Sequence, residues 1–439
     1  MPGTACCMLA AFLGSAAVEA AAGVDSEVAA GRAPIDLYDP EEQNSITFTV
    51  VPGAALRLRS LTDTLTLSYT PRIFYRAPNA LDVSRPLVLH QLQFGQSTEF
   101  SRRLVWTSTL GASIGEVDYT ASNLVFETAT GGLRTSVADI LHLEGETGIR
   151  YELSRRWRWT WDVDGDYTRP LGDQPTTPQV PPPGVDIGDV PLGGVPESAQ
   201  VSTRTGFSYA LSRADRVGIN GEVTYQWFPD TGRFLLLSPD VTYEKQLSGR
   251  TNVGVSAGMA YVVTVEAIDG DQENSFGGTG GFQYNSVVYR ARSAVVSMGL
   301  AGSLDWFFDP IAGTSQPRAG VDGSSNIAIG RDWTITPNAS FYTLLRESRS
   351  ATGPGRDAMG NNTTVELISL DATQLRAEIP FSYRLADPAY LTFGARASLR
   401  GRSMLDEDFS LTERVEFWAF VGLTLRLSTG RDTGSWLSL

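Results

Sequence analysis

One stretch constrains the fold of this chain more than any other: RWRWTWDVDGDY, residues 156–167. Its odd-numbered positions begin with Trp157, Trp159, Trp161 and Val163, whereas the even-numbered positions carry arginine, threonine and aspartate. Alternate side chains of a β-strand point to opposite faces. As a strand, this stretch would have one aromatic face and one charged face, so it needs apolar surroundings on one side and water on the other.

The same alternation of apolar and polar residues recurs along most of the chain. It is clear in 65–75, 149–153, 217–227, 375–383, 391–399 and 415–427, and we find no helical period of 3.6 residues. The alternating runs are longer than the roughly 5–6 residues of a soluble strand. They fit the roughly 9–11 residues that a tilted strand needs to cross a bilayer.

The connections between these runs alternate in length. Short ones fall at 60–63, 100–103, 154–156, 212–215, 248–250, 289–293, 330–332 and 385–389. Longer ones fall between them, at 77–86, 115–140, 168–198, 265–275, 309–317, 346–366 and 403–410, and only 229–233 breaks the rule. Short periplasmic turns and long external loops are typical of bacterial outer-membrane barrels. We therefore predict an all-β fold, a transmembrane antiparallel up-and-down barrel. A large soluble β-sandwich or a β-solenoid remains the alternative.

The strand count follows from topology. About 17 runs lie between Ser45 and Ser428, and the first of them travels from outside to inside, so one strand must precede it. The weakly alternating segment 16–28 can supply that strand. We expect an even total of about 18 strands, with about 16 as the fallback if a weak run, 317–329 or 234–246, is not a strand.

Charge and cysteine content restrict the partners and the cellular compartment that we expect for this protein. The net charge of −14 argues against a nucleic-acid partner. Cys6 and Cys7 lie in ACCMLAAFLGSAA, which is typical of the apolar region of a signal peptide, although its positively charged flank is missing. We predict a signal peptide over 1–17 with a truncated or misassigned start, and one barrel over 18–439. A cleaved chain would contain no cysteine, so we expect no disulfide, no thiolate metal site and no cofactor.

Two segments resemble known families. VVPGAALRLRSLTDTLTLSYTPR, residues 50–72, resembles the opening hairpin of large outer-membrane barrels of the porin type, some of which are associated with exopolysaccharide export. The resemblance implies an 18-stranded barrel in the bacterial outer membrane, in contact with lipid and lipopolysaccharide, that passes material such as a polysaccharide, with periplasmic export components as partners. EFWAFVGLTLRLS resembles the signal read by the barrel-assembly machinery, but the chain continues for TGRDTGSWLSL beyond it.

Catalysis has little support in the sequence. GASIG (111–115) and GVSAG (254–258) match the G-x-S-x-G motif, which needs a sharp strand-to-helix turn, yet both lie inside alternating runs. His90 and His142 are the only histidines. We predict that the protein is not an enzyme and keep an outer-membrane hydrolase with a Ser–His pair as a minor alternative.

Charged residues at the polar positions of the alternating runs are the candidate pore-lining residues. They are Arg156, Arg158, Asp162, Asp164, Arg376, Glu378, Arg396, Arg400, Arg414, Glu416 and Arg426. Two hypotheses fit the arginines: a path that favours anions such as an acidic polysaccharide, or a self-satisfied Arg–Glu ladder that stiffens the wall. If the arginines line an open path, we expect Arg396 and Arg400 to face water.

The aspartates and the loops carry weaker hypotheses. DVDGD, 162–166, mimics a calcium loop, but a strand cannot wrap its own aspartates around one ion, so we favour an acidic stripe on the lumen wall. Acidic loops at 266–274 and 405–409 could bind calcium or bridge lipopolysaccharide phosphates. The proline-rich loop 168–198 is a lid, a constriction or an extracellular flap. Transport is the favoured function, with a structural or adhesive role of the long loops as the alternative.

Overall fold

The computed structural model describes residues 17–34, 42–78, 85–118, 137–171, 185–186, 197–229, 232–267, 274–309, 314–345, 351–357, 362–367, 373–401, 404–405 and 414–429. Every regular element among them is a β-strand, and no helix there is long and apolar enough to cross a membrane. The predicted signal peptide lies outside the described residues, apart from Ala17, which begins the first strand.

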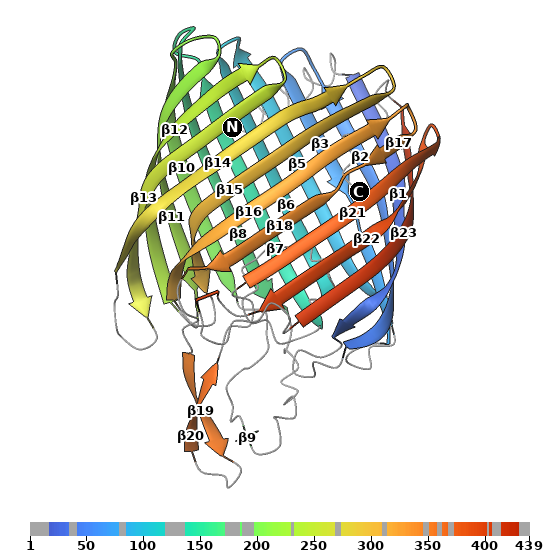
Figure 1. Ribbon diagram of the computed structural model, residues 1–439, viewed down its shortest axis with the longest axis vertical. Helices are drawn as coiled ribbons and strands as arrows, with labels where there is room; N and C mark the ends of the chain where they lie inside the picture. The colour runs from blue at the N-terminus through green and yellow to red at the C-terminus, as the bar shows by residue number, and fades with distance from the viewer. Residues whose placement is uncertain are drawn as a thin grey trace, which may run out of the picture.

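Twenty strand segments form one closed sheet, which makes the barrel of Figure 1. In chain order they are β1 (Ala17–Pro34), β2 (Glu42–Arg59), β3 (Asp63–Tyr69), β4 (Arg72–Ala77), β5 (Leu87–Ser101), β6 (Leu104–Asp118), β7 (Val137–Tyr151), β8 (Trp157–Pro170), β10 (Ser198–Ala210), β11 (Asp215–Phe228), β12 (Gly232–Ser248), β13 (Thr251–Ala267), β14 (Ser275–Arg290), β15 (Ala294–Asp309), β16 (Thr314–Ile329), β17 (Trp333–Ile335), β18 (Asn338–Leu344), β21 (Thr373–Ala386), β22 (Ala389–Gly401) and β23 (Arg414–Ser428).

Two crossings of the barrel wall are interrupted in the same way. β3 and β4 are separated by Thr70 and Pro71, and β17 and β18 by Thr336 and Pro337. Proline has no N–H to donate to the sheet, so the ladder breaks there. Each pair of segments continues along the same neighbouring strands, and the barrel therefore has 18 crossings. The predicted strand number is confirmed, and both weak runs are strands, β16 and β12.

The first strand closes the barrel. β1 pairs antiparallel with β2 over its whole length, from Ala17 opposite Arg59 to Pro34 opposite Glu42. On its other edge it pairs with the last strand, β23, from Ala21 opposite Ser428 to Arg32 opposite Phe417. The prediction that residues 16–28 contribute the first strand is confirmed, although the strand extends six residues further, to Pro34. Closure leaves no sheet edge unpaired, as a sheet in lipid requires.

The outer and inner faces differ as the alternation predicts. On β23, Phe417 and Val421 are 53% and 48% exposed, whereas Glu416 and Trp418, which point to the other face, are each 1% exposed. Large apolar side chains stand exposed in the same way on the outer face of most other crossings, among them Phe48, Leu110, Val201, Ile219, Tyr243, Val255 and Met298. An apolar outer surface on a closed barrel belongs in lipid, and the outer membrane of bacteria is where such barrels reside.

The tight turns are clamped by short polar side chains. In SLTD and SRAD, the hydroxyl oxygen of Ser60 or Ser212 accepts a hydrogen bond from the amide of the aspartate three residues later, at 2.9 Å and 3.1 Å. Such serine turns reverse a chain within a few residues. Another turn uses Gly330, whose φ of +66° is costly for other residues. The tight turns lie at the end of the barrel that holds the start of β1, except the short connection 229–233 between β11 and β12, which lies at the other end.

A small second sheet lies at the opposite end of the barrel (Figure 1). It joins β9 (Val185–Asp186), β19 (Ala351–Asp357) and β20 (Asn362–Leu367), all from segments that the sequence predicts to be loops. Local alternation did not indicate these strands. Residues 168–170 of the predicted proline-rich loop belong to β8 and Ser198 begins β10, while 172–184 and 187–196 lie outside the described residues, as do 346–350 and 358–361.

Candidate functional site

The candidate site is the lumen wall, which has a basic side. Three neighbouring strands, β21, β22 and β23, form the centre of this basic side, and their pairing fixes which residues stand opposite one another. Glu378 stands opposite Arg396, and Arg376 stands opposite Ser398, which in turn stands opposite Glu416. We call Arg376, Arg396, Arg400 and Arg426, with Arg72 and Arg76 of β4, the basic wall. Figure 1 shows β21 and β22 on the near side of the barrel.

Arg396 does not pair with Glu378, the carboxylate that stands opposite it. Its guanidinium forms a salt bridge with Glu27 of β1, and it also lies 4.9 Å from the centroid of the Phe420 ring. Its side chain is only 13% exposed, and Arg400 as a residue is 5% exposed. The expectation that both arginines face water is wrong: the side chains of Glu27 and Phe420 contact Arg396, and Arg400 is buried.

The N-terminal strands add residues that sequence reasoning missed. Arg76 on β4 is 3% exposed; its guanidinium donates to the hydroxyl of Ser45 at 3.1 Å and lies 5.8 Å from the Trp418 ring. Arg57 on β2 donates from Nε to Glu19 of β1 at 2.7 Å. The signal that could have found them is closure itself: in a barrel the first and last strands must be neighbours, so charges at both chain ends meet.

Two arginines of the basic wall differ from Arg396. Within the described residues, neither Arg376 nor Arg426 forms a salt bridge, whereas Arg396 does. The Nε atoms of all three are buried with no hydrogen-bond partner. The backbone of Arg426 pairs with Gly23, a residue without a side chain. Glu378 also forms no salt bridge with a described residue. Arg414 pairs with Arg400 through its backbone, and its side chain lies outside the described residues.

An acidic wall lies on the other side of the barrel, on β7 and β8. Glu144 stands opposite Asp166, and Glu146 opposite Asp164. Asp162 stands opposite Gly148, where an added Cβ would lie 2.3 Å from its Oδ1, so the glycine makes room for this carboxylate. The predicted acidic stripe therefore runs over two strands, and the ring order of the strands places it roughly across from β21.

The remaining two predicted residues lie toward the tight-turn end. Arg158 on β8 lies 3.4 Å from a carboxylate oxygen of Glu152. Arg156 lies in the turn before β8 and donates to the hydroxyl of Tyr209, whose ring packs against the outward-facing Trp157 at 4.8 Å. Arg156 is thus a residue of the barrel rim and not of the lumen wall.

The two G-x-S-x-G motifs lie within strands, not at strand-to-helix turns. Ser113 on β6 does stand opposite His142 on β7, and both are buried. However, His142 Nδ1 lies 2.8 Å from the hydroxyl of Thr168, and its Nε2 lies 3.9 Å from Glu144. Among the described residues no hydrogen bond joins Ser113 to His142. His90 faces outward and bonds the hydroxyl of Tyr69 at 2.7 Å.

The described residues contain no group of three or more histidine, cysteine or acidic side chains suited to a metal ion. Most of the acidic loops at 266–274 and 405–409, for which calcium is one hypothesis, lie outside those residues.

Comparisons with known proteins found matches among solved structures only. No protein-family model matches the chain, and no curated protein does. Among solved structures, a BenF-like porin from Pseudomonas fluorescens Pf-5 has 10% identity and a TM-score of 0.45, covering 93% of this chain and 99% of that one. OccK2 (OpdF) from Pseudomonas aeruginosa has 10% identity and a TM-score of 0.44, covering 93% and 98%.

A third structure, the FrpB iron transporter from Neisseria meningitidis, has 8% identity and a TM-score of 0.43, covering 92% of this chain and 81% of that one. At these identities the likeness concerns fold alone.

Proposed function

We propose that this barrel is an outer-membrane channel whose lumen favours anionic solutes. One observation carries the proposal: a closed lipid-facing barrel places a basic wall across its lumen from an acidic wall. Barrels of about 16–18 strands are wide enough to hold an aqueous channel. Charged groups that line a pore select among ions by steering and by hydrogen bonding.

The arginines divide into two groups, and we assign one hypothesis to each group. Arg396 and Arg57 are held by Glu27 and Glu19, so these pairs belong to a stiffening ladder. Arg376 and Arg426 have no carboxylate partner among the described residues, and they are the arginines that we assign to an anion path. An arginine fork binds carboxylate or phosphate oxygens in pairs.

Export of a polysaccharide remains a finer prediction from the resemblance of residues 50–72. The charge pattern supports an acidic solute in general and does not favour a polymer over a small anion. A structural or adhesive role would rest on the long loops, most of which lie outside the described residues.

The reversal potential in a salt gradient tests the proposal. We expect the parent channel to favour anions over cations. The double variant Arg376→Ser with Arg426→Ser should shift the reversal potential toward cations, because two fixed positive charges leave the wall. Arg102→Ser, in the exposed turn between β5 and β6, removes a charge at the rim and is the matched control. A cation-selective parent whose selectivity does not move in the double variant would contradict the anion path.

A further inference from the structure

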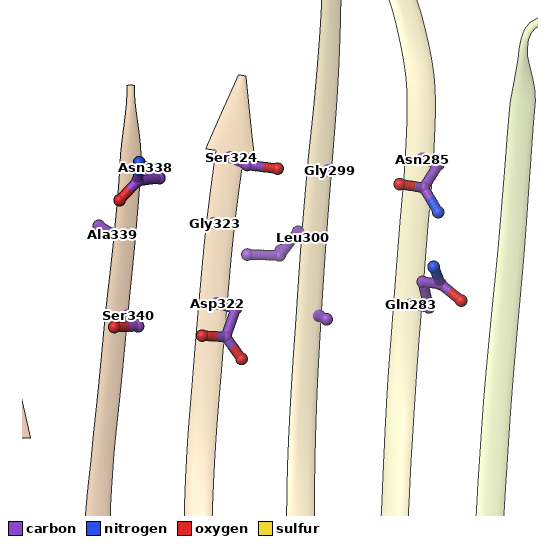
Figure 2. A pocket seen from close by; sticks show the side chains of 11 residues that line it. Gln283, Asn285, Gly299, Leu300, Asp322, Gly323, Ser324, Asn338, Ala339 and Ser340 are labelled. Carbon is purple, nitrogen blue, oxygen red and sulfur yellow. The ribbon is translucent and has the colours of Figure 1, made fainter. Parts of the chain in front are cut away.

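A polar recess lies in the lumen wall beside the basic wall. It extends over β14, β15, β16 and β18 and has a volume of about 310 Å³. Figure 2 shows the side chains that line it from four neighbouring strands. Its polar lining consists of three amides, two hydroxyls and one carboxylate: Gln283, Asn285, Asn338, Ser324, Ser340 and Asp322.

Gly299 makes the space at the floor of this recess. Figure 2 shows Asn285 and Ser324 on either side of it. A Cβ added at Gly299 would lie 3.0 Å from the Ser324 hydroxyl and 3.1 Å from Oδ1 of Asn285. The glycine therefore keeps these two polar groups facing each other across open space.

Within the described residues, none of the six polar side chains of the recess makes a side-chain hydrogen bond. Other polar pairs on the wall do bond each other: Ser202 bonds Thr224 at 3.0 Å, and Asn220 bonds Asp240 at 2.6 Å. Asn285 and Ser324 are instead exposed to the lumen, so their amide and hydroxyl groups are available to a solute.

The chemistry of the lining indicates the solute. An amide offers both donors and an acceptor, a serine hydroxyl does the same, and a carboxylate only accepts. This mixture matches a molecule whose hydroxyl groups both donate and accept. No arginine or lysine lines the recess, and the single carboxylate, Asp322, disfavours an anion in it.

We propose that the recess is a subsite for an uncharged, hydroxyl-rich unit, a saccharide or a polyol. The proposal deepens the channel function and rests on it. The register places Ser340 directly opposite Arg376, which begins the basic wall. A hydroxylated acid could thus set its hydroxyls in the recess and its carboxylate against Arg376.

Saturation-transfer NMR on the detergent-solubilised barrel measures binding without requiring ion flow. Sucrose and sorbitol are the probes, a methyl-capped polyethylene glycol of similar mass is the probe without donors, and the detergent must carry no sugar headgroup. We expect saturable signals from sucrose and sorbitol and none from the capped glycol.

Two variants of different chemistry test the recess, so that the misfolding of one variant does not decide the outcome. Gly299→Val fills the recess, and Asn285→Ala with Asn338→Ala removes two amides while it leaves the backbone intact. Each should weaken sucrose binding by about fivefold or more, as expected when at least one hydrogen bond is lost. Gln91→Ala, an amide on the remote β5, is the matched control and should bind as the parent does.

The outcomes separate the two proposals. Ion conduction with no sucrose signal, or with equal signals in parent and recess variants, would overturn the subsite and leave the channel standing. Sucrose binding that the recess variants abolish, in a barrel that does not conduct ions, would support the subsite as a binding site and overturn the channel.

Discussion

At the scale of single residues, the two faces of each strand face different solvents, and depth along the strand sets the cost of a change. Val223 lies near the middle of β11 on the outer face, whereas Trp157 begins β8 next to a tight turn. Charged substitutions on the lipid face cost most at the midplane and little near the interfaces. The tryptophan ladder of β8 therefore begins in the interfacial zone.

Val223→Arg should lower the free energy of unfolding by about 2–4 kcal/mol, and Trp157→Arg by about 0–1 kcal/mol. Denaturant titrations of barrels refolded into lipid vesicles measure both. If the two variants lose the same stability, or if neither loses any, the assignment of the outer face or of its depth is wrong.

The Arg396–Glu27 salt bridge is a second residue-scale feature, since it links the last hairpin to the first strand. With side chains 13% and 24% exposed, the pair is largely shielded from water. Removing one partner leaves the other charge poorly solvated.

Arg396→Gln should cost about 1–3 kcal/mol, and the double change Arg396→Gln with Glu27→Gln should cost less than the sum of the single changes. The same refolding titrations give the coupling energy. Strictly additive losses would mean that the two side chains do not interact in the membrane.

At the scale of elements, the pairing of β1 with β23, which we call the seam, closes the barrel by joining the first strand to the last. Ala30 stands opposite Ala419, and Ala419 stands opposite Ala395 on β22, so three outward-facing alanines lie side by side on three strands.

Cysteines at 30 and 419 should therefore form a cross-link with a short bismaleimide, seen as a mobility shift of the denatured chain. Cysteines at 30 and 395 are separated by one strand and are the matched control, with Cys6 and Cys7 replaced by serine throughout. Cross-linking of 30 with 395 but not with 419 would show that the barrel closes differently.

The local alternation of residues predicts much of this fold, but it does not predict the contacts at the seam. Alternation along 415–427 predicts the strand and its two faces, because the period of two is a property of each strand alone. It does not reveal that Glu27 meets Arg396, since that contact depends on closure between residues far apart in the chain. The recess was also missed, because the residues that line it come from four strands, and no single strand carries a distinctive motif.

At the scale of the whole molecule, the two ends of the barrel are unequal. One end has tight turns and both the start of β1 and the end of β23; the other has the long connections and the small three-stranded sheet (Figure 1). We predict that the long connections are extracellular, as in other bacterial barrels.

Protease added to intact cells should cleave within 168–198, because long proline-rich segments outside a sheet are accessible. Cleavage is read from fragment sizes on a gel. Protection in intact cells, with cleavage only after the outer membrane is permeabilised, would invert the orientation.

The central claim is that the closed barrel encloses a water-filled path lined by opposed charges. Single-channel recording of the purified, refolded protein in a planar lipid bilayer tests it most directly. We predict stepwise increases in ionic current as barrels insert, with a lasting open level. A protein that inserts as a folded barrel, yet leaves the bilayer as resistive as lipid alone, would contradict the claim.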